Sequence, residues 1–199
     1  MSSPDTRERI VTTALDLFHH RSYSGVGVKE ICDSAGIQKG SFYHFFPSKR
    51  DVALAVVDRM AEVWAERVVA QAFDPKTAPL ARLDRLIELS HAWQCQVRGT
   101  DGAMPGCLFG NLALEVSTSD EVLRAHLAAV FRRAAQPFRA TLEEAVSTGT
   151  IEPLDTQRTA EAMLAYLEGV LLMAKAHKDP GLVLTLGPAI KTLRVERMD

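Results

Sequence analysis

The stretch over residues 28–50 constrains the fold more than any other part of this 199-residue chain. Its first part predicts a short helix whose apolar face is made by residues at i, i+3, i+4 and i+7, namely Val28, Ile31, Cys32 and Ala35. Gly36 then breaks the pattern, and a glycine can take the positive φ that a sharp turn between two helices needs. A second short helix follows over about 39–46. The stretch therefore predicts a helix-turn-helix.

The second helix has a polar side that suits contact with DNA. Its aromatic residues, Phe42 and Phe45 with Phe46, are expected to turn inward. Donors, acceptors and an aromatic ring then remain on the other side, as a helix that reads the major groove requires. Lys49 lies near the N–H groups that open the following helix, where a DNA phosphate can be held. The candidate DNA contacts are Lys29, Gln38, Lys39, Gly40, Ser41, Tyr43, His44 and Lys49.

These residues closely resemble the signature of the tetracycline-repressor (TetR) family of regulators, over roughly residues 6–57. The resemblance rests on Ile31, Ala35-Gly36, the run from Lys39 to Phe46, and Ser48-Lys49. Gln38, Ser22 and Gly27 depart from the family at helix ends. The resemblance implies a dimeric transcriptional regulator, a repressor whose affinity for its operator falls when an effector enters the C-terminal domain. It also implies that the effector tilts the helix that joins the two domains.

Composition and charge fit a DNA-binding protein with an acidic remainder. Hydrophobic residues make up 47% of the chain and charged residues 24%, as in globular proteins. The net charge is −2, but residues 1–50 hold seven Lys and Arg against five Asp and Glu, and the remainder holds sixteen against twenty. The N-terminal part therefore suits phosphate better. No signal peptide or membrane span is expected, and three cysteines predict a reducing, cytoplasmic setting.

Helical patterns continue to the C-terminus without a strand pattern, so the chain is predicted to be all-α. We expect an N-terminal three-helix helix-turn-helix domain over 1–47 and a C-terminal helical ligand-binding and dimerisation domain over 48–199. A connecting helix is predicted over 48–72, capped by Ser48 with Asp51 at the third position. Further helices are expected after Pro79, around 107–116, from about 119 to Gly149, over 155–177 and over 180–195.

The last two helices are apolar on more than one face, so they need burial on several sides. Small residues, Ala165, Gly169 and Ala174, would let another helix approach closely. A symmetric four-helix interface between two copies of the chain is one reading. A central position in a monomeric bundle is the other. The family resemblance implies the homodimer, which would also present two reading helices to two half-sites of double-stranded operator DNA.

The middle helices are expected to enclose a pocket for an unknown small-molecule effector, as the resemblance implies. Its candidate residues are Trp64, Trp93, Cys107, Phe109, Asn111, Glu115, Phe131, Met163, Tyr166 and Met173. For each aromatic residue and methionine, ordinary core packing is the competing interpretation. Asn111 and Glu115 are polar groups on a short apolar helix, so they need partners. Those partners are either an effector or the ends of neighbouring helices.

Cys107 supports a second hypothesis about the effector. The segments Gly106-Cys107-Leu108 and Leu172-Met173-Ala174-Lys175 resemble the electrophile-responsive, NemR-like branch of the family, in which a reactive cysteine works beside a lysine. At the start of a helix, backbone N–H groups favour a thiolate, and a nearby Lys175 ammonium would add to this effect. Cys107 and Lys175 are therefore a possible redox switch. The alternative is that Cys107 is a small buried hydrophobe and Lys175 a solvated cation.

Other classes of function find little support in the sequence. We see no nucleophile elbow, phosphate-binding glycine loop or metal-ligand spacing among His91, His126 and His177, so we expect no enzyme, metal or cofactor. An all-α interaction protein without DNA binding remains the rival. The cluster of polar residues over 39–44 argues against this rival, because a helix with a purely structural role does not require Lys, Tyr and His beside a glycine.

Overall fold

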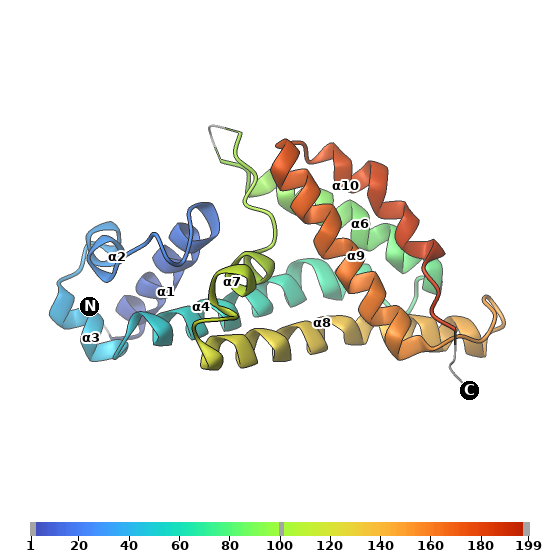
Figure 1. The fold of residues 1–199 in the computed structure, drawn as a ribbon, viewed down its shortest axis with the longest axis horizontal. Coiled ribbons are helices and arrows are strands. Elements are labelled where there is room, and N and C mark those ends of the chain that lie inside the picture. The colour runs from blue at the N-terminus through green and yellow to red at the C-terminus, as the bar shows by residue number, and fades with distance from the viewer. Residues whose placement is uncertain (1–2, 100–101, 197–199) are drawn as a thin grey trace. The chain divides into compact units, whose positions relative to one another are not determined.

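The computed structural model describes residues 3–99 and 102–196, and every regular element in these ranges is a helix (Figure 1). The prediction of an all-α chain is confirmed. None of the helices in the described part is long and apolar enough to cross a membrane. The elements are α1 (Ser3–His20), α2 (Val28–Ala35), α3 (Lys39–Phe45), α4 (Lys49–Trp64), the π-helical turn η1 (Ala65–Val69), α5 (Ala70–Ala72), α6 (Pro79–Gln96), α7 (Leu108–Val116), α8 (Glu121–Ser147), α9 (Thr156–His177), α10 (Gly181–Leu186) and the 3-10 helix η2 (Gly187–Thr192).

The chain divides into two compact units that interleave along the sequence. The first unit comprises residues 1–63 and 107–128, and the second comprises 64–106 and 129–199. The first unit therefore contains α1 to α4 together with α7 and the beginning of α8. The sequence placed the domain boundary near residue 47, and that boundary stays a prediction. What the structure adds is that α7 contacts α1 and belongs to the same unit as the helix-turn-helix, although it lies about sixty residues further along the chain.

The first unit is built on a core of apolar residues from α1, α2, α3 and α4. Of the predicted apolar face of α2, Ile31, Cys32 and Ala35 are buried and Val28 is half-buried. On α3 the inward residue is Phe42, which has no exposed surface, and Phe46 just after the helix is 4% exposed. Further side chains that close this core are Ile10, Val11, Ala14, Phe18, Val52, Ala53, Val56 and Val57.

The connecting helix predicted over 48–72 is continuous but not uniform. Ser48 caps α4 as predicted, because its Oγ accepts a hydrogen bond from the backbone N–H of Asp51 at 3.3 Å and donates to the Asp51 carboxylate at 2.6 Å. The helix then widens into η1 before it ends as α5. A π-helical turn inserts an extra residue into the helical ladder and is frequent at functional sites. It lies next to the boundary between the two compact units.

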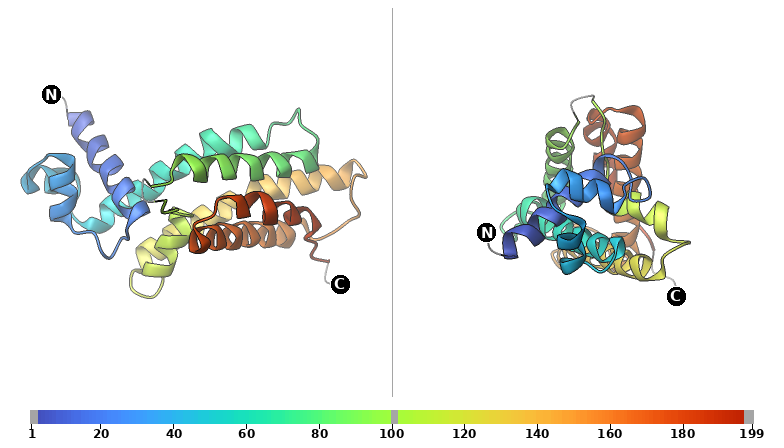
Figure 2. Two further views of the ribbon diagram at one scale, coloured as in Figure 1. Left: turned by 90° about the horizontal axis from the view of Figure 1, so that it is seen from above. Right: turned by 90° about the vertical axis from the view of Figure 1, so that its left-hand side faces the viewer.

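In the second unit, α10 packs on both α6 and α9, as two views of the ribbon show (Figures 1 and 2). The packing is close at Gly187, where a Cβ atom would lie 2.6 Å from the Ile87 side chain. Any larger residue at this position would push the η2 segment away from α6. The buried apolar residues of the three helices include Leu83, Leu86, Ile87, Met163, Leu167, Val170, Leu171, Ala174 and Val183.

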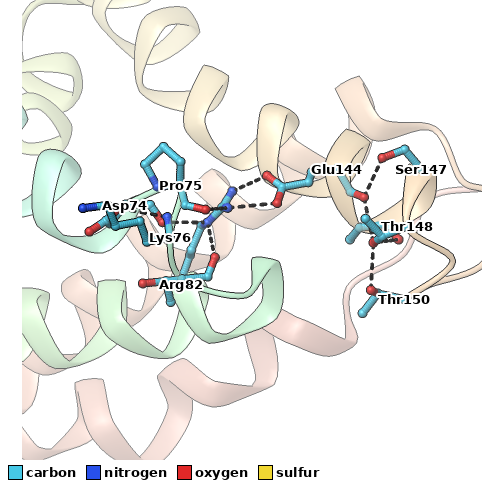
Figure 3. Close-up of polar contacts among 10 residues, drawn as sticks. Asp74, Pro75, Lys76, Arg82, Glu144, Ser147, Thr148 and Thr150 are labelled. Carbon is cyan, nitrogen blue, oxygen red and sulfur yellow. Dashed lines mark hydrogen bonds and ion pairs between the residues drawn. The ribbon is translucent and has the colours of Figure 1, made fainter.

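A buried arginine fastens the start of α6 to the end of α8 (Figure 3). Arg82 is only 5% exposed, and its guanidinium donates to both carboxylate oxygens of Glu144, at 2.6 and 3.0 Å. It also donates to the backbone carbonyls of Asp74, Pro75 and Thr77 at 2.8–3.1 Å. Such a planar group can satisfy a carboxylate and a turn at the same time. The turn over 74–77 and two helices therefore depend on one side chain.

Replacing Arg82 by Ala should lower the free energy of unfolding by about 2–4 kcal/mol, because the turn carbonyls and the Glu144 carboxylate lose their donor. Urea unfolding at fixed protein concentration measures this change. Arg85→Ala is the matched control, since Arg85 lies on the same helix and, within the described part of the chain, pairs with exposed Glu88 alone, at 3.0 Å. That control should change the free energy by less than about 0.5 kcal/mol. Equal losses in the two variants would contradict the assigned role of Arg82.

Candidate nucleic-acid interface and effector region

Helix α3 presents the predicted polar side to solvent. The residues Gln38, Lys39, Gly40, Ser41, Tyr43 and His44 are all exposed, whereas Phe42 is buried beneath them. Tyr43 is 52% exposed, and its ring meets that of Phe42 edge to face with centroids 5.2 Å apart. The Phe42 anchor therefore fixes the helix while leaving the phenol and the neighbouring donors uncovered. Their role in DNA binding stays a prediction.

The turn between α2 and α3 has the geometry that the sequence predicted. Gly36 has φ 62° and ψ 43°, in the left-handed region that favours glycine. The backbone N–H of Ile37 donates to the carbonyl of Cys32 at 3.0 Å, and that of Gly36 donates to Asp33 at 3.2 Å. These two bonds close the end of α2. The angle at which α3 leaves α2 is thus set by the backbone.

Two of the predicted DNA-binding lysines already have partners within the first unit. Lys29 pairs with Asp33 one turn along α2, at 2.6 Å, and this hydrogen bond raises the pKa of its exposed ammonium. Lys49 is half-buried, and its Nζ donates to the backbone carbonyls of Tyr23 at 2.9 Å and Val26 at 3.0 Å. It also lies 4.2 Å from the centroid of the Tyr23 ring. Burial lowers the pKa of Lys49, and the nearby Glu115 carboxylate opposes that shift.

Glu115 holds the same loop from the other side. Its carboxylate accepts hydrogen bonds from the backbone N–H groups of Tyr23 at 3.1 Å and Ser24 at 2.7 Å. Of the two kinds of partner that the sequence left open for this residue, the structure supplies a protein partner, although it is a loop and not the end of a helix. We call the two side chains, Lys49 and Glu115, with the loop over 23–26 that they bind, the loop clamp.

An ion pair and a contact at hydrogen-bond distance also join α4 to the segment around the start of α8. Arg50 Nε lies 2.6 Å from Asp120 Oδ2, and Asp58 lies 2.8 Å from Nε2 of His126. Burial acts to raise the pKa of Asp120, but the hydrogen bonds from Arg50 and from the backbone N–H of Leu123 outweigh it, so the net shift is downward. The beginning of α8 is therefore joined to the connecting helix inside the first unit.

The predicted effector residues are divided between the two units. Cys107, Phe109, Asn111 and Glu115 belong to α7 and its cap in the first unit, and the others belong to the second. Phe109 and Met163 are buried, whereas Trp64, Trp93, Asn111, Phe131 and Tyr166 are half-buried. The Tyr166 hydroxyl donates to the backbone carbonyl of Leu186 at 2.7 Å, so it ties α9 to α10. Arg67 lies over the Trp93 ring at 5.8 Å.

Cys107 is half-buried and is the residue just before α7. The helix therefore begins at Leu108, one residue later than the sequence indicated. Gly106 before it has φ 72°, and a Cβ atom there would lie 3.1 Å from the side chain of Lys175. The lysine stem is thus packed against the residue that precedes the cysteine. Cys95 is exposed, with its Sγ 3.5 Å from Nε2 of His91, and Cys32 is buried, which raises the pKa of its thiol.

Several large apolar side chains of α9 and α10 are exposed. Leu172 is 54% exposed, and Met173, a predicted effector residue, is 45% exposed. Leu184 and Leu186 of α10 are also large exposed hydrophobic residues. A Cβ atom at Gly169, one turn before Met173, would meet nothing within 4 Å. Apolar side chains gathered on exposed helix faces are typical of a surface that another protein covers.

The chain is similar to known proteins over nearly its whole length. The family model described as "Bacterial regulatory proteins, tetR family" matches residues 10–56, and "Tetracyclin repressor-like, C-terminal domain" matches residues 79–185. Transcriptional regulator AcuR of Cereibacter sphaeroides is 35% identical over 87% of this chain and 78% of its own. HTH-type transcriptional repressor NemR of Escherichia coli is 28% identical over 88% of this chain and 86% of its own.

A crystal structure of a regulatory protein TetR from Rhodobacter sphaeroides superimposes with a TM-score of 0.84 at 28% identity, covering 94% of this chain and 98% of that one. Family regulators bind operator DNA as dimers. These similarities agree with the helix-turn-helix found in the structure, whose reading helix stands on buried Phe42. The chain belongs to the TetR family and is a DNA-binding transcriptional regulator.

Proposed function

We propose that the protein is a repressor that binds its operator as a homodimer and is released by a small-molecule effector. The observation that carries the proposal is the exposed polar side of α3, which stands on buried Phe42 after the tight turn at Gly36. Gln38, Lys39, Gly40, Ser41, Tyr43 and His44 would contact the DNA, with Lys29 and Lys49 at its phosphates. The protein would act in the cytoplasm without catalysis, metal or cofactor.

We propose that the dimer forms through α9 and α10. The exposed side chains of Leu172, Met173, Leu184 and Leu186 would be buried between the two copies, and Gly169 would permit a close approach of helices. Covering these partly exposed side chains would remove apolar surface from water, which favours association. In this arrangement Met173 would serve the interface and not the wall of an effector pocket.

The route from effector to DNA would pass through the loop clamp. Glu115 stands at the end of α7, and Cys107, Phe109 and Asn111 stand at its beginning, where an effector would act. A displacement of α7 would move the Glu115 carboxylate away from the N–H groups of Tyr23 and Ser24. The loop before α2 would then lose two of its hydrogen bonds and shift. The reading helix α3, which follows it in the chain, would shift as well.

A thiol switch at Cys107 is the second candidate for the effector response. The contact between the Lys175 stem and Gly106 favours it, because the lysine lies beside the residue that precedes the thiol. Modification by an electrophile or oxidant would enlarge a half-buried side chain at the cap of α7. That change would act on the same helix as a ligand bound in a pocket. The two candidates therefore share the loop clamp and differ only in the first step.

Tyr43→Ala should weaken operator binding about tenfold, because an exposed side chain that contacts DNA is lost while buried Phe42 still fixes the helix. Lys39→Ala should flatten the slope of log affinity against log salt by about one unit for each subunit. Titration of labelled operator at several salt concentrations measures both effects. Lys76→Ala, an exposed lysine in the second unit, is the control. Parental affinity and slope in both variants would refute the assignment. Lys49→Ala is less informative, since it also breaks the loop clamp.

Gly169→Arg should convert the dimer into folded monomers, because the added side chain has room in the single chain but would meet the partner. Sedimentation velocity gives the oligomeric state, and circular dichroism gives the helix content. Ala140→Arg places the same side chain at an exposed position on α8 and should leave the dimer intact. A stable dimer of the Gly169→Arg protein would remove this face of α9 from the interface.

If the thiol switch operates, N-ethylmaleimide should release the parent protein from its operator, and Cys107→Ser should abolish the release. Electrophoretic mobility of the labelled operator follows the release. Cys32→Ser and Cys95→Ser are the controls, and the second matters because Cys95 is exposed beside His91. Release of the Cys107→Ser protein as readily as the parent would exclude the switch and leave a pocket ligand as the effector.

A further inference from the structure

Two buried oxygen atoms on α6 have no hydrogen-bond partner within residues 3–99 and 102–196. They are Oγ of Ser90 and Oε1 of Gln94. Ser90 is 1% exposed and Gln94 is 2% exposed, so bulk water does not satisfy them. A buried polar group without a partner destabilises the folded state, and native structures contain few of them. Two such atoms one helical turn apart therefore need an explanation.

The orientation of the Gln94 amide is fixed by its other end. Nε2 donates to the backbone carbonyl of Gly106 at 3.3 Å, so Oε1 points away from that carbonyl. Exchanging the two amide atoms would bring two acceptors together, which is unfavourable. Oε1 is therefore an acceptor without a donor. Ser90, four residues earlier, lies on the same face of α6 and can both donate and accept.

The two atoms share their helix with buried apolar side chains. Leu83, Leu86 and Ile87 are the buried apolar residues of α6. Its buried Arg82 is bonded to Glu144 and to the turn over 74–77, and within the described ranges no charged side chain forms a hydrogen bond with Ser90 or Gln94. A ligand that completes the two groups must offer one donor to Oε1 and one donor or acceptor to Oγ. A neutral hydroxyl or primary amide meets both needs. A charged group would be buried against neutral partners at a large cost.

We propose that Ser90 and Gln94 form the polar end of the effector site and bind the hydroxyl or primary amide of a small, mostly apolar molecule. The proposal deepens the proposed function and rests on it for the word effector. Gln94 would also report occupancy, because its amide holds the carbonyl of Gly106, the second residue before α7. A ligand that donates a hydrogen bond to Oε1 would polarise the Gln94 amide and fix its position against the Gly106 carbonyl.

Binding can be tested without DNA, by titrating nitrogen-15-labelled protein with butan-1-ol and with its isomer methyl propyl ether in heteronuclear NMR. The two probes have the same atoms, but only the alcohol donates a hydrogen bond. The parent should bind the alcohol about fivefold more tightly than the ether, as expected for one added hydrogen bond. Gln94→Met should remove this preference while leaving the affinity for the ether unchanged. No saturable binding of the alcohol, or an equal preference in parent and variant, would overturn the proposal.

Thermal unfolding provides a second test, which distinguishes unpartnered oxygens from oxygens satisfied by buried water. Ser90→Ala should raise the Tm of the ligand-free protein by about 2–4 °C, because a group buried without a partner is removed. Thr159→Val is the matched control, since the Thr159 hydroxyl is also buried but accepts from the backbone N–H of Val195 at 3.0 Å. That control should lower the Tm by a similar amount.

A fall in Tm for Ser90→Ala like that of the control would show that the hydroxyl is already satisfied and would overturn the proposal. Operator release is measured separately with the parent protein. If the alcohol binds through Gln94 but does not release the operator, the site stands and the proposed repressor mechanism fails. If the operator is released by other compounds while the alcohol shows no preference, the mechanism stands and this site fails.

Discussion

The loop between α1 and α2 depends on two opposite charges that bind its backbone. The Lys49 ammonium donates hydrogen bonds to the carbonyls of Tyr23 and Val26. The Glu115 carboxylate accepts hydrogen bonds from the N–H groups of Tyr23 and Ser24. A loop has no ladder of its own to satisfy these groups, so their partners must come from elsewhere. Lys49 belongs to the connecting helix and Glu115 to α7. The position of the loop, and of α2 and α3 after it, is therefore set jointly by both helices.

Through Glu115, the nine-residue helix α7 helps to position the loop that precedes the helix-turn-helix. A helix of that length spans roughly 13 Å. Its cap follows the segment over 104–106, which is buried and bonded to Gln94 through Gly106. Its other end carries the clamp carboxylate. Chemistry at the cap and the geometry of the reading head are thus joined by one short element.

The sequence predicted the features that depend on neighbours along the chain. The helical faces, the left-handed Gly36 and the Ser48 cap needed only local periodicity and backbone preference, and the structure confirms them. The partners of Glu115 and Arg82 lie about ninety and sixty residues away, so no local pattern could name them. Glu115 did carry a signal, as a carboxylate on an apolar helix. No sequence pattern predicted the π-helical turn over 65–69. The grouping of α7 with the first unit arises from tertiary packing alone.

Four buried polar side chains of the second unit differ in whether their hydrogen bonds are completed, and the difference bears on function. Arg82 and Thr159 are buried with their hydrogen bonds completed, so they stabilise the turn and the chain end that they hold. Ser90 and Gln94 are equally buried, but each keeps one atom without a partner in the described ranges. Selection for stability alone would replace such residues with apolar ones of similar shape. Their presence in a domain whose family matches that of tetracycline-repressor-like regulators is explained if the missing partner is a ligand. On that reasoning, the two side chains of α6 with unpartnered oxygens are where specificity for an effector would reside.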